Sequence, residues 1–213
     1  MKTSFKTLFA SALTGLLLTS SAFATFAVGN GPSSPIISQL IDYNKVIVSG
    51  NVKVLLIQSK RQHVVMYEDY NKETTTLVQK GDKLYISSTE RQPVNVVVYI
   101  KDLQRIDACN KASVTTRGKF SSPALQVFLK DGATAYVNGD TESLYTVIKD
   151  NSELRLKGSC KDHILVKGKV AKLNVNNFAA LKTTATSVDG QALPGDYSIL
   201  LRTDTVAAGN RVR

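Results

Sequence analysis

The sequence predicts an all-β fold: a single-stranded, right-handed parallel β-helix, or solenoid, with about 19 residues per coil in the C-terminal half. Residue types recur at a spacing of 19 in this half, and a fixed period of this length is typical of stacked coils. Short runs such as Leu154-Arg155-Leu156 alternate apolar and polar residues, which indicates strands with one buried face. Helical periodicity never persists beyond a turn or two after the N-terminal segment.

Columns of equivalent residues carry the period. Two of them lie two residues apart and would face the same side of a strand. A third opens each repeat and fails at His163, and a fourth holds residue types that tolerate a left-handed turn. In this order, the columns are Thr116, Ala135, Leu154 and Leu173; Gly118, Val137, Leu156 and Val175; Ile106, Leu125 and Leu144; and Gly139, Gly158 and Asn177.

Turn signals separate the predicted strands. Lys130-Asp131-Gly132, Lys149-Asp150-Asn151 and Lys167-Gly168-Lys169 each lie between two short apolar runs. One coil alone buries too little apolar surface to offset its conformational entropy, whereas several stacked coils can. The predicted strands are residues 46–48, 52–57, 64–67, 75–78, 84–87, 94–100, 125–129, 133–137, 144–148, 152–156, 164–166 and 170–175.

The N-terminal residues predict an export signal over 1–24. Lys2 and Lys6 precede an apolar run over residues 8–18, and Ala22-Phe23-Ala24 supplies an A-x-A cleavage site. The run is shorter than the roughly 20 residues of a membrane span, and no later stretch is expected to cross a membrane as a helix. We therefore expect an exported protein, located in the periplasm, at the cell surface or outside the cell.

Composition divides the rest into a linker (25–41), a β domain (42–190) and a C-terminal tail (191–213). The net charge of the whole chain is +10, with 27 basic and 17 acidic residues. Lysines are dispersed over turns and strand ends, where they would guard strand edges. A basic surface that pairs with acidic glycans or another envelope component is the alternative. Export and dispersed charge both argue against nucleic-acid binding.

No catalytic residue, metal site or cofactor is expected. Cys160 and His163 form a C-x-x-H pair without the second pair of a zinc site, so His163 is interpreted as a replacement for an aliphatic residue. Asp131 and Asp150 lie 19 residues apart, but each follows a lysine and suits a turn. The sequence contains neither a nucleophile elbow nor a phosphate-binding glycine loop.

Two cysteines, Cys109 and Cys160, are predicted to be unpaired. Their separation of 51 residues is not a multiple of 19, so they would lie on different sides of non-adjacent coils. Export favours a disulfide, and an irregular placement of coils would still allow one.

Candidate binding residues are Tyr136, Arg155 and Asn174. They share the outward register of neighbouring coils, and the guanidinium fork of Arg155 suits a sugar carboxylate. Cross-strand packing and edge protection explain the same residues equally well.

Several segments of the chain together resemble a known family of exported bacterial β-solenoid domains. The segments are VIVSGNVKVLLIQ (46–58), VVMYEDYN (64–71), GDKLYIS (81–87) and VNVVVYIKDLQRIDACNKASVTT (94–116). They resemble the putative auto-transporter adhesin head GIN domain family over about residues 42–190. The family's small G-S-G turns are replaced here by bulkier ones, such as Cys109-Asn110-Lys111. The resemblance implies the solenoid fold, an exported location and an adhesive role.

These observations favour a non-catalytic binding or structural module of the bacterial cell envelope. A carbohydrate-active lyase or hydrolase on the same scaffold is the alternative. It would require a groove with two close carboxylates or a carboxylate–arginine pair. The expected partner is an acidic glycan or another envelope component, and the sequence does not predict an oligomeric state.

Overall fold

A computed structural model describes residues 36–38, 42–66, 70–191 and 193 of the chain. They belong to one compact unit, residues 33–213. The predicted export signal (1–24) and most of the linker and tail lie outside the described residues, as does Tyr67 at the end of a predicted strand. Ile36–Ser38, within the expected linker, forms a strand. The described part of the chain holds no helix long and apolar enough to span a membrane.

Thirteen strands form one hydrogen-bonded sheet and account for nearly all the regular structure in the described residues. They are β1 (Ile36–Ser38), β2 (Lys45–Gly50), β3 (Val52–Gln58), β4 (His63–Met66), β5 (Thr75–Lys80), β6 (Lys83–Ser88), β7 (Val94–Ile100), β8 (Arg105–Cys109), β9 (Ser113–Arg117), β10 (Phe120–Leu129), β11 (Thr134–Ile148), β12 (Glu153–Lys167) and β13 (Lys172–Ser187).

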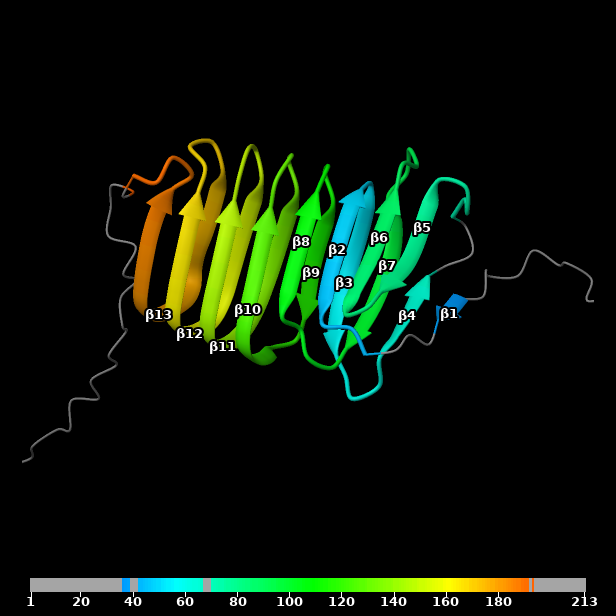
Figure 1. Ribbon diagram of the computed structural model, residues 1–213, viewed down its shortest axis with the longest axis horizontal. Coiled ribbons are helices and arrows are strands. Elements are labelled where there is room, and N and C mark those ends of the chain that lie inside the picture. The colour runs from blue at the N-terminus through cyan, green and yellow to red at the C-terminus, as the bar shows by residue number, and fades with distance from the viewer. Residues whose placement is uncertain (1–35, 39–41, 67–69, 192, 194–213) are drawn as a thin grey trace, which may run out of the picture. The chain divides into compact units, whose positions relative to one another are not determined.

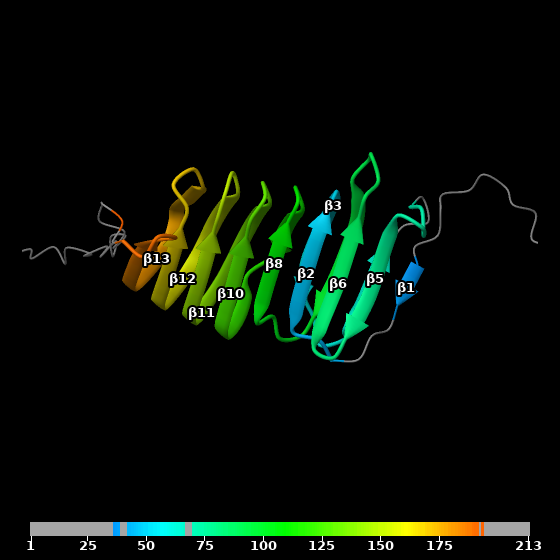
Figure 2. The ribbon, with the colours of Figure 1, turned by 45° about the horizontal axis from the view of Figure 1, so that its top comes forward.

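The sheet curls over on itself into two layers (Figure 1). One layer contains β5, β6, β2, β8 and β10, and the other contains β7, β3 and β9 (Figures 1 and 2). The long strand β11 belongs to both layers, because its residues Thr134–Tyr136 pair with β9 and its residues 143–148 pair with β10. β12 and β13 continue the same path. The paired predicted strands 133–137 and 144–148 are therefore two halves of one bent strand.

Parallel pairing aligns residues 19 apart over β10, β11 and most of β12. Leu125 pairs with Leu144, which pairs with His163. Ala135 pairs with Leu154, which pairs with Leu173. Equivalent aliphatic side chains thus lie side by side on neighbouring strands.

The predicted columns are wrong at both ends of this region. Ile106 pairs with Val127, two residues beyond the expected Leu125. The chain has two more residues between Thr115 and Phe120 than between their partners Tyr136 and Gly139. These extra residues include Gly118, which lies in a turn at φ 75° and not in the strand column expected for it. A slip of two keeps every side chain on its face, so apolar periodicity cannot detect it.

A bulge between Arg155 and Lys157 also shifts the pairing of β12 with β13. Gly158 consequently pairs with Phe178 and not with the expected Asn177. Glycine is required at the bend of β12, since Gly158 has φ 102° and an added Cβ would lie 2.1 Å from the carbonyl oxygen of Gly139. The predicted glycine column therefore marks the bend between the layers at Gly139 and Gly158 only.

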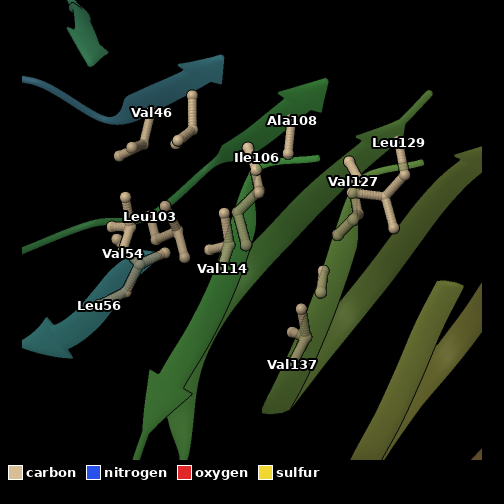
Figure 3. Packing of buried hydrophobic residues seen from close by; sticks show 14 of the residues in the cluster. Val46, Val54, Leu56, Leu103, Ile106, Ala108, Val114, Val127, Leu129 and Val137 are labelled. Carbon is tan, nitrogen blue, oxygen red and sulfur yellow. The ribbon is translucent and has the colours of Figure 1, made fainter. Parts of the chain in front are cut away.

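The hydrophobic core lies between the two layers. Figure 3 shows side chains from β2, β8 and β10 directed toward those from β3, β9 and β11. Val46, Ile106 and Val127 on the first layer and Val114 on the second are fully buried. Complete burial of such a side chain is worth about 1.5–3 kcal/mol. The alternating pattern seen in the sequence thus places its apolar residues inward.

Replacing Leu154 with Asp should unfold the domain. Leu154 is 0% exposed and lies between Ala135 and Leu173, so the carboxylate would be buried without a partner. We expect a loss of more than about 4 kcal/mol in the free energy of unfolding, measured by urea denaturation followed by circular dichroism. Lys157→Asp, on the exposed face of the same strand, should change it by less than about 0.5 kcal/mol. A stable Leu154→Asp protein would contradict the inward placement.

His163 should make the stability sensitive to mild acid. The imidazole is 3% exposed, and its Nε2 lies 2.9 Å from Thr146 Oγ1. Burial lowers the pKa of His163 from 6.5 to about 4, so the unfolded chain takes up the proton first. Stability is complete above about pH 6.5 and falls as the pH drops toward 4.

Between pH 7.5 and 5 we expect a loss of about 2 kcal/mol from this group, measured by urea unfolding at each pH. The double substitution His163→Leu and Thr146→Val removes both hydrogen-bonding partners and should flatten this dependence. An equal pH dependence in the double variant would mean that other groups cause it.

Candidate functional site

The three candidate binding residues lie side by side on the outer face of the layer that contains β9. Tyr136 of β11 pairs with Arg155 of β12, which pairs with Asn174 of β13. All three side chains are exposed, and that of Tyr136 is 38% exposed. Parallel pairing thus brings together residues that are 19 apart in the sequence. We call this set the outer strip.

Glu153 fixes one side of the Arg155 guanidinium. The Nε of Arg155 donates a hydrogen bond to Glu153 Oε1 over 2.6 Å, and the Arg155 side chain is 61% exposed. Within the described residues, neither terminal nitrogen of Arg155 donates to a protein acceptor. The guanidinium is therefore oriented by its neighbour while its fork stays available to a ligand.

A shallow hollow of about 330 Å³ lies beside the outer strip. Its lining combines small polar side chains with one aromatic ring and one ion pair. The lining residues are Ser113, Thr115, Thr134, Ala135, Tyr136, Glu153 and Arg155. This set can stack on a ring face and donate charge-assisted hydrogen bonds.

Glu153 is the one carboxylate in the lining of this hollow. Glycoside hydrolysis ordinarily uses two carboxyl groups that flank the scissile bond. The nearest equivalent to the groove expected of an enzyme is thus the Arg155–Glu153 pair. Its geometry suits the recognition of a charged group.

Carboxylates at the bend between the layers are engaged by lysines. Asp140 forms an ion pair with Lys119 and accepts a hydrogen bond from Ser159 Oγ over 2.8 Å. Glu142 accepts one from Lys161 Nζ over 2.8 Å. The hydrogen bonds from Lys119 and Lys161 lower the pKa of these two carboxyl groups. They stay ionised at neutral pH and are poorly suited to act as general acids.

The C-x-x-H pair forms no metal centre with other described residues. Cys160 and His163 are both buried, and across the described ranges no three His, Cys, Asp or Glu side chains gather as metal ligands. Burial raises the pKa of the Cys160 thiol to about 11, which keeps it protonated. His163 occupies the aliphatic column as expected, with its ring edge against Phe178. Cys109 and Cys160 are both free thiols.

Asp131 and Asp150 have turn roles. Their φ angles are 55° and 52°, in the left-handed region that aspartate tolerates better than most residues. The backbone amide of Asp131 donates to Asp150 Oδ2 over 3.2 Å. This bond ties two successive turns together.

A second hollow, which sequence reasoning missed, lies on the outer face of the other layer. Its volume is about 400 Å³, and aromatic and valine side chains dominate its lining together with two lysines. The signal was present in the sequence: Phe128-Leu129 and Val147-Ile148 are apolar pairs 19 apart, so one member of each pair must face outward. The lining residues are Asp107, Phe128, Leu129, Lys130, Tyr145, Val147, Lys149, Val166 and Val188.

Solved structures share this fold. A putative adhesin from Bacteroides fragilis has a TM-score of 0.62 and 15% identity, covering 72% of this chain and 75% of the other. A putative lipid binding protein from Parabacteroides distasonis has a TM-score of 0.57 and 11% identity, covering 75% and 80%. A putative adhesin from Parabacteroides merdae has a TM-score of 0.52 and 13% identity, covering 75% and 79%. At these identities the likeness concerns the fold alone.

No curated protein matches the chain. The model of one family, described as putative auto-transporter adhesin, head GIN domain, matches residues 42–192. The match spans nearly all the described strands and more than half of the sequence. The chain therefore belongs to the putative auto-transporter adhesin, head GIN domain family.

Proposed function

We propose that the protein is an exported, non-catalytic binding module of the bacterial cell envelope that holds an acidic glycan along the outer strip. The observation that carries the proposal is the arrangement of Arg155. Its guanidinium is oriented by Glu153, has free terminal nitrogens and lies between Tyr136 and Asn174 on paired strands. An aromatic face, a cationic fork and an amide in one line suit a sugar ring that bears a carboxylate.

The even spacing of the strip supports a polymeric ligand. Neighbouring strands of a sheet lie about 4.8 Å apart, so the strip repeats its contacts at regular intervals. We further propose that β10–β13 wind as a right-handed parallel β-helix of about 19 residues per coil. The register of 19 between β10 and β11, and between β11 and β12, supports this interpretation.

Family membership and charge support an envelope role. The family's description names an adhesin head, and two of the similar solved structures are described as adhesins. The net charge of +10 would attract an anionic polymer over longer distances. Together with the export signal predicted over residues 1–24, these features favour action in the periplasm, at the cell surface or outside the cell.

Arg155→Gln should weaken binding to a polyuronic acid. We expect at least a tenfold rise in Kd for polygalacturonate, about 1.4 kcal/mol, because a charge-assisted bond is lost. Calorimetric titration of the purified protein would measure the change, with neutral dextran as the non-binding polymer. Lys157→Gln is the matched control, since Lys157 is exposed on the same face and strand and loses the same charge.

The control should change Kd by less than about twofold. Equal losses in Arg155→Gln and Lys157→Gln would show that overall charge causes binding, and unchanged affinity in Arg155→Gln would remove the outer strip from the site. Tyr136→Ala should also weaken binding, through loss of the stacking surface.

The ion pair of Arg155 with Glu153 is the feature that keeps a carbohydrate-active lyase or hydrolase as a second candidate. The two functions differ in their response to Glu153→Gln. Retention of the polymer without product release, at unchanged or higher affinity in the variant, supports the binding module. Release of shorter products that stops in the variant would support an enzyme.

A further inference from the structure

An apolar row crosses the outer face of the layer that contains β2, β8 and β10. At this outward position, successive paired strands carry aliphatic or aromatic side chains, interrupted only by Asp107. In order of pairing, the row is Val78, Tyr85, Ile47, Asp107, Phe128, Val147 and Val166. Val78 at one end is 43% exposed.

Outward positions normally carry polar residues when only one face of a sheet is covered. The opposite layer follows this rule, with Thr134, Glu153 and Lys172 paired at equivalent outward positions. The apolar row departs from it on strands that belong to the same domain. A contiguous apolar surface on an otherwise polar face usually marks a binding site.

The apolar row is concave over β10, β11 and β12, where the hollow of about 400 Å³ lies. Phe128 and Tyr145 form part of its floor, with ring centroids 5.7 Å apart and planes inclined by 56°. The Arg105 guanidinium lies 4.0 Å from the Phe128 ring centroid and 3.0 Å from Asp107 Oδ2. Phe128 is thus held in place by a cation that is itself neutralised.

Lysines supply an excess of positive charge at one end of this hollow. Lys130 and Lys149 lie in the turns that border β11, and both side chains line the hollow. Lys130 Nζ is 3.8 Å from Asp131 Oδ2, a weak contact. Among the described residues, Lys149 has no carboxylate partner. Because Arg105 neutralises Asp107, these lysines leave the lining net positive.

We propose that this hollow binds an amphiphilic anion, a molecule with an aliphatic or aromatic body and a carboxylate, phosphate or sulfate group. The body would lie on Phe128, Tyr145, Val147 and Val166, and the anionic group between Lys130 and Lys149. A volume of about 400 Å³ falls within the range of small-molecule sites. The site lies on the other layer from the outer strip and is independent of glycan binding.

Octyl sulfate and octyl glucoside form a matched pair of probes, since they share the chain and differ in charge. Below their micellar concentrations, calorimetric titration of the purified protein should give at least tenfold tighter binding for octyl sulfate. The double variant Lys130→Gln and Lys149→Gln should lose at least tenfold in octyl sulfate affinity and little in octyl glucoside affinity. Val166→Thr, which keeps the side-chain shape but makes it polar, should weaken both.

The matched control is the double variant Lys157→Gln and Lys172→Gln, which removes the same charge from the opposite layer. It should bind octyl sulfate within twofold of the native protein, as should Arg155→Gln. Equal losses in the two lysine pairs, equal affinity for the two probes, or loss in Arg155→Gln would each overturn the proposal. So would concentration-dependent self-association that Val166→Thr abolishes, because the occupant would then be a second copy of the chain.

Vesicles distinguish the two sources of such an anion. Sedimentation with phosphatidylglycerol but not phosphatidylcholine vesicles, lost in the Lys130→Gln and Lys149→Gln variant, would identify a lipid headgroup in a membrane. Binding of octyl sulfate without sedimentation would identify a free amphiphile. Both results support the proposed site, whereas sedimentation that is unchanged in this variant together with unchanged octyl sulfate affinity would overturn it.

Discussion

The parallel register between neighbouring strands is the constraint on which the other features depend. A register of 19 residues repeats the same face at every strand, so inward aliphatic side chains such as Ala135 and Leu154 align and share one core. The same alignment acts on the outward side chains, which nobody would expect to meet from their sequence separation. Both the outer strip and the apolar row are therefore consequences of core packing, with ligand-facing chemistry added at positions that the core leaves free.

Much of the fold could be predicted because burial leaves a periodic record in the sequence. The positions of the strands, the turn at Asp131 and the aliphatic role of His163 all follow from it. The slip at Gly118 could not, because two extra residues preserve the alternation of faces. Sequence reasoning also aligned the members of the outer strip. It missed the hollow at Phe128 because a search for polar clusters ignores apolar residues on a solvent-facing row.

Turn chemistry separates this chain from the small-residue turns of its family. Asn110, Lys111, Asp131 and Asp150 adopt left-handed backbone angles without being glycine. Asparagine and aspartate tolerate this region because their side chains can bond to nearby backbone. Asp150 does so across two turns, through the amide of Asp131. Lysine has no such compensation, and nothing in the structure explains its presence at position 111.

Length is a variable that this architecture leaves open to evolution. Since β11 and β12 present matching edges along their whole paired length, a duplicated segment of 19 residues could be inserted between them without altering either neighbour. Each insertion would lengthen the two outer faces by one strand while the ends of the domain stayed the same. Homologues that differ by whole multiples of this unit would then present longer or shorter footprints for extended ligands, with affinity adjusted by copy number.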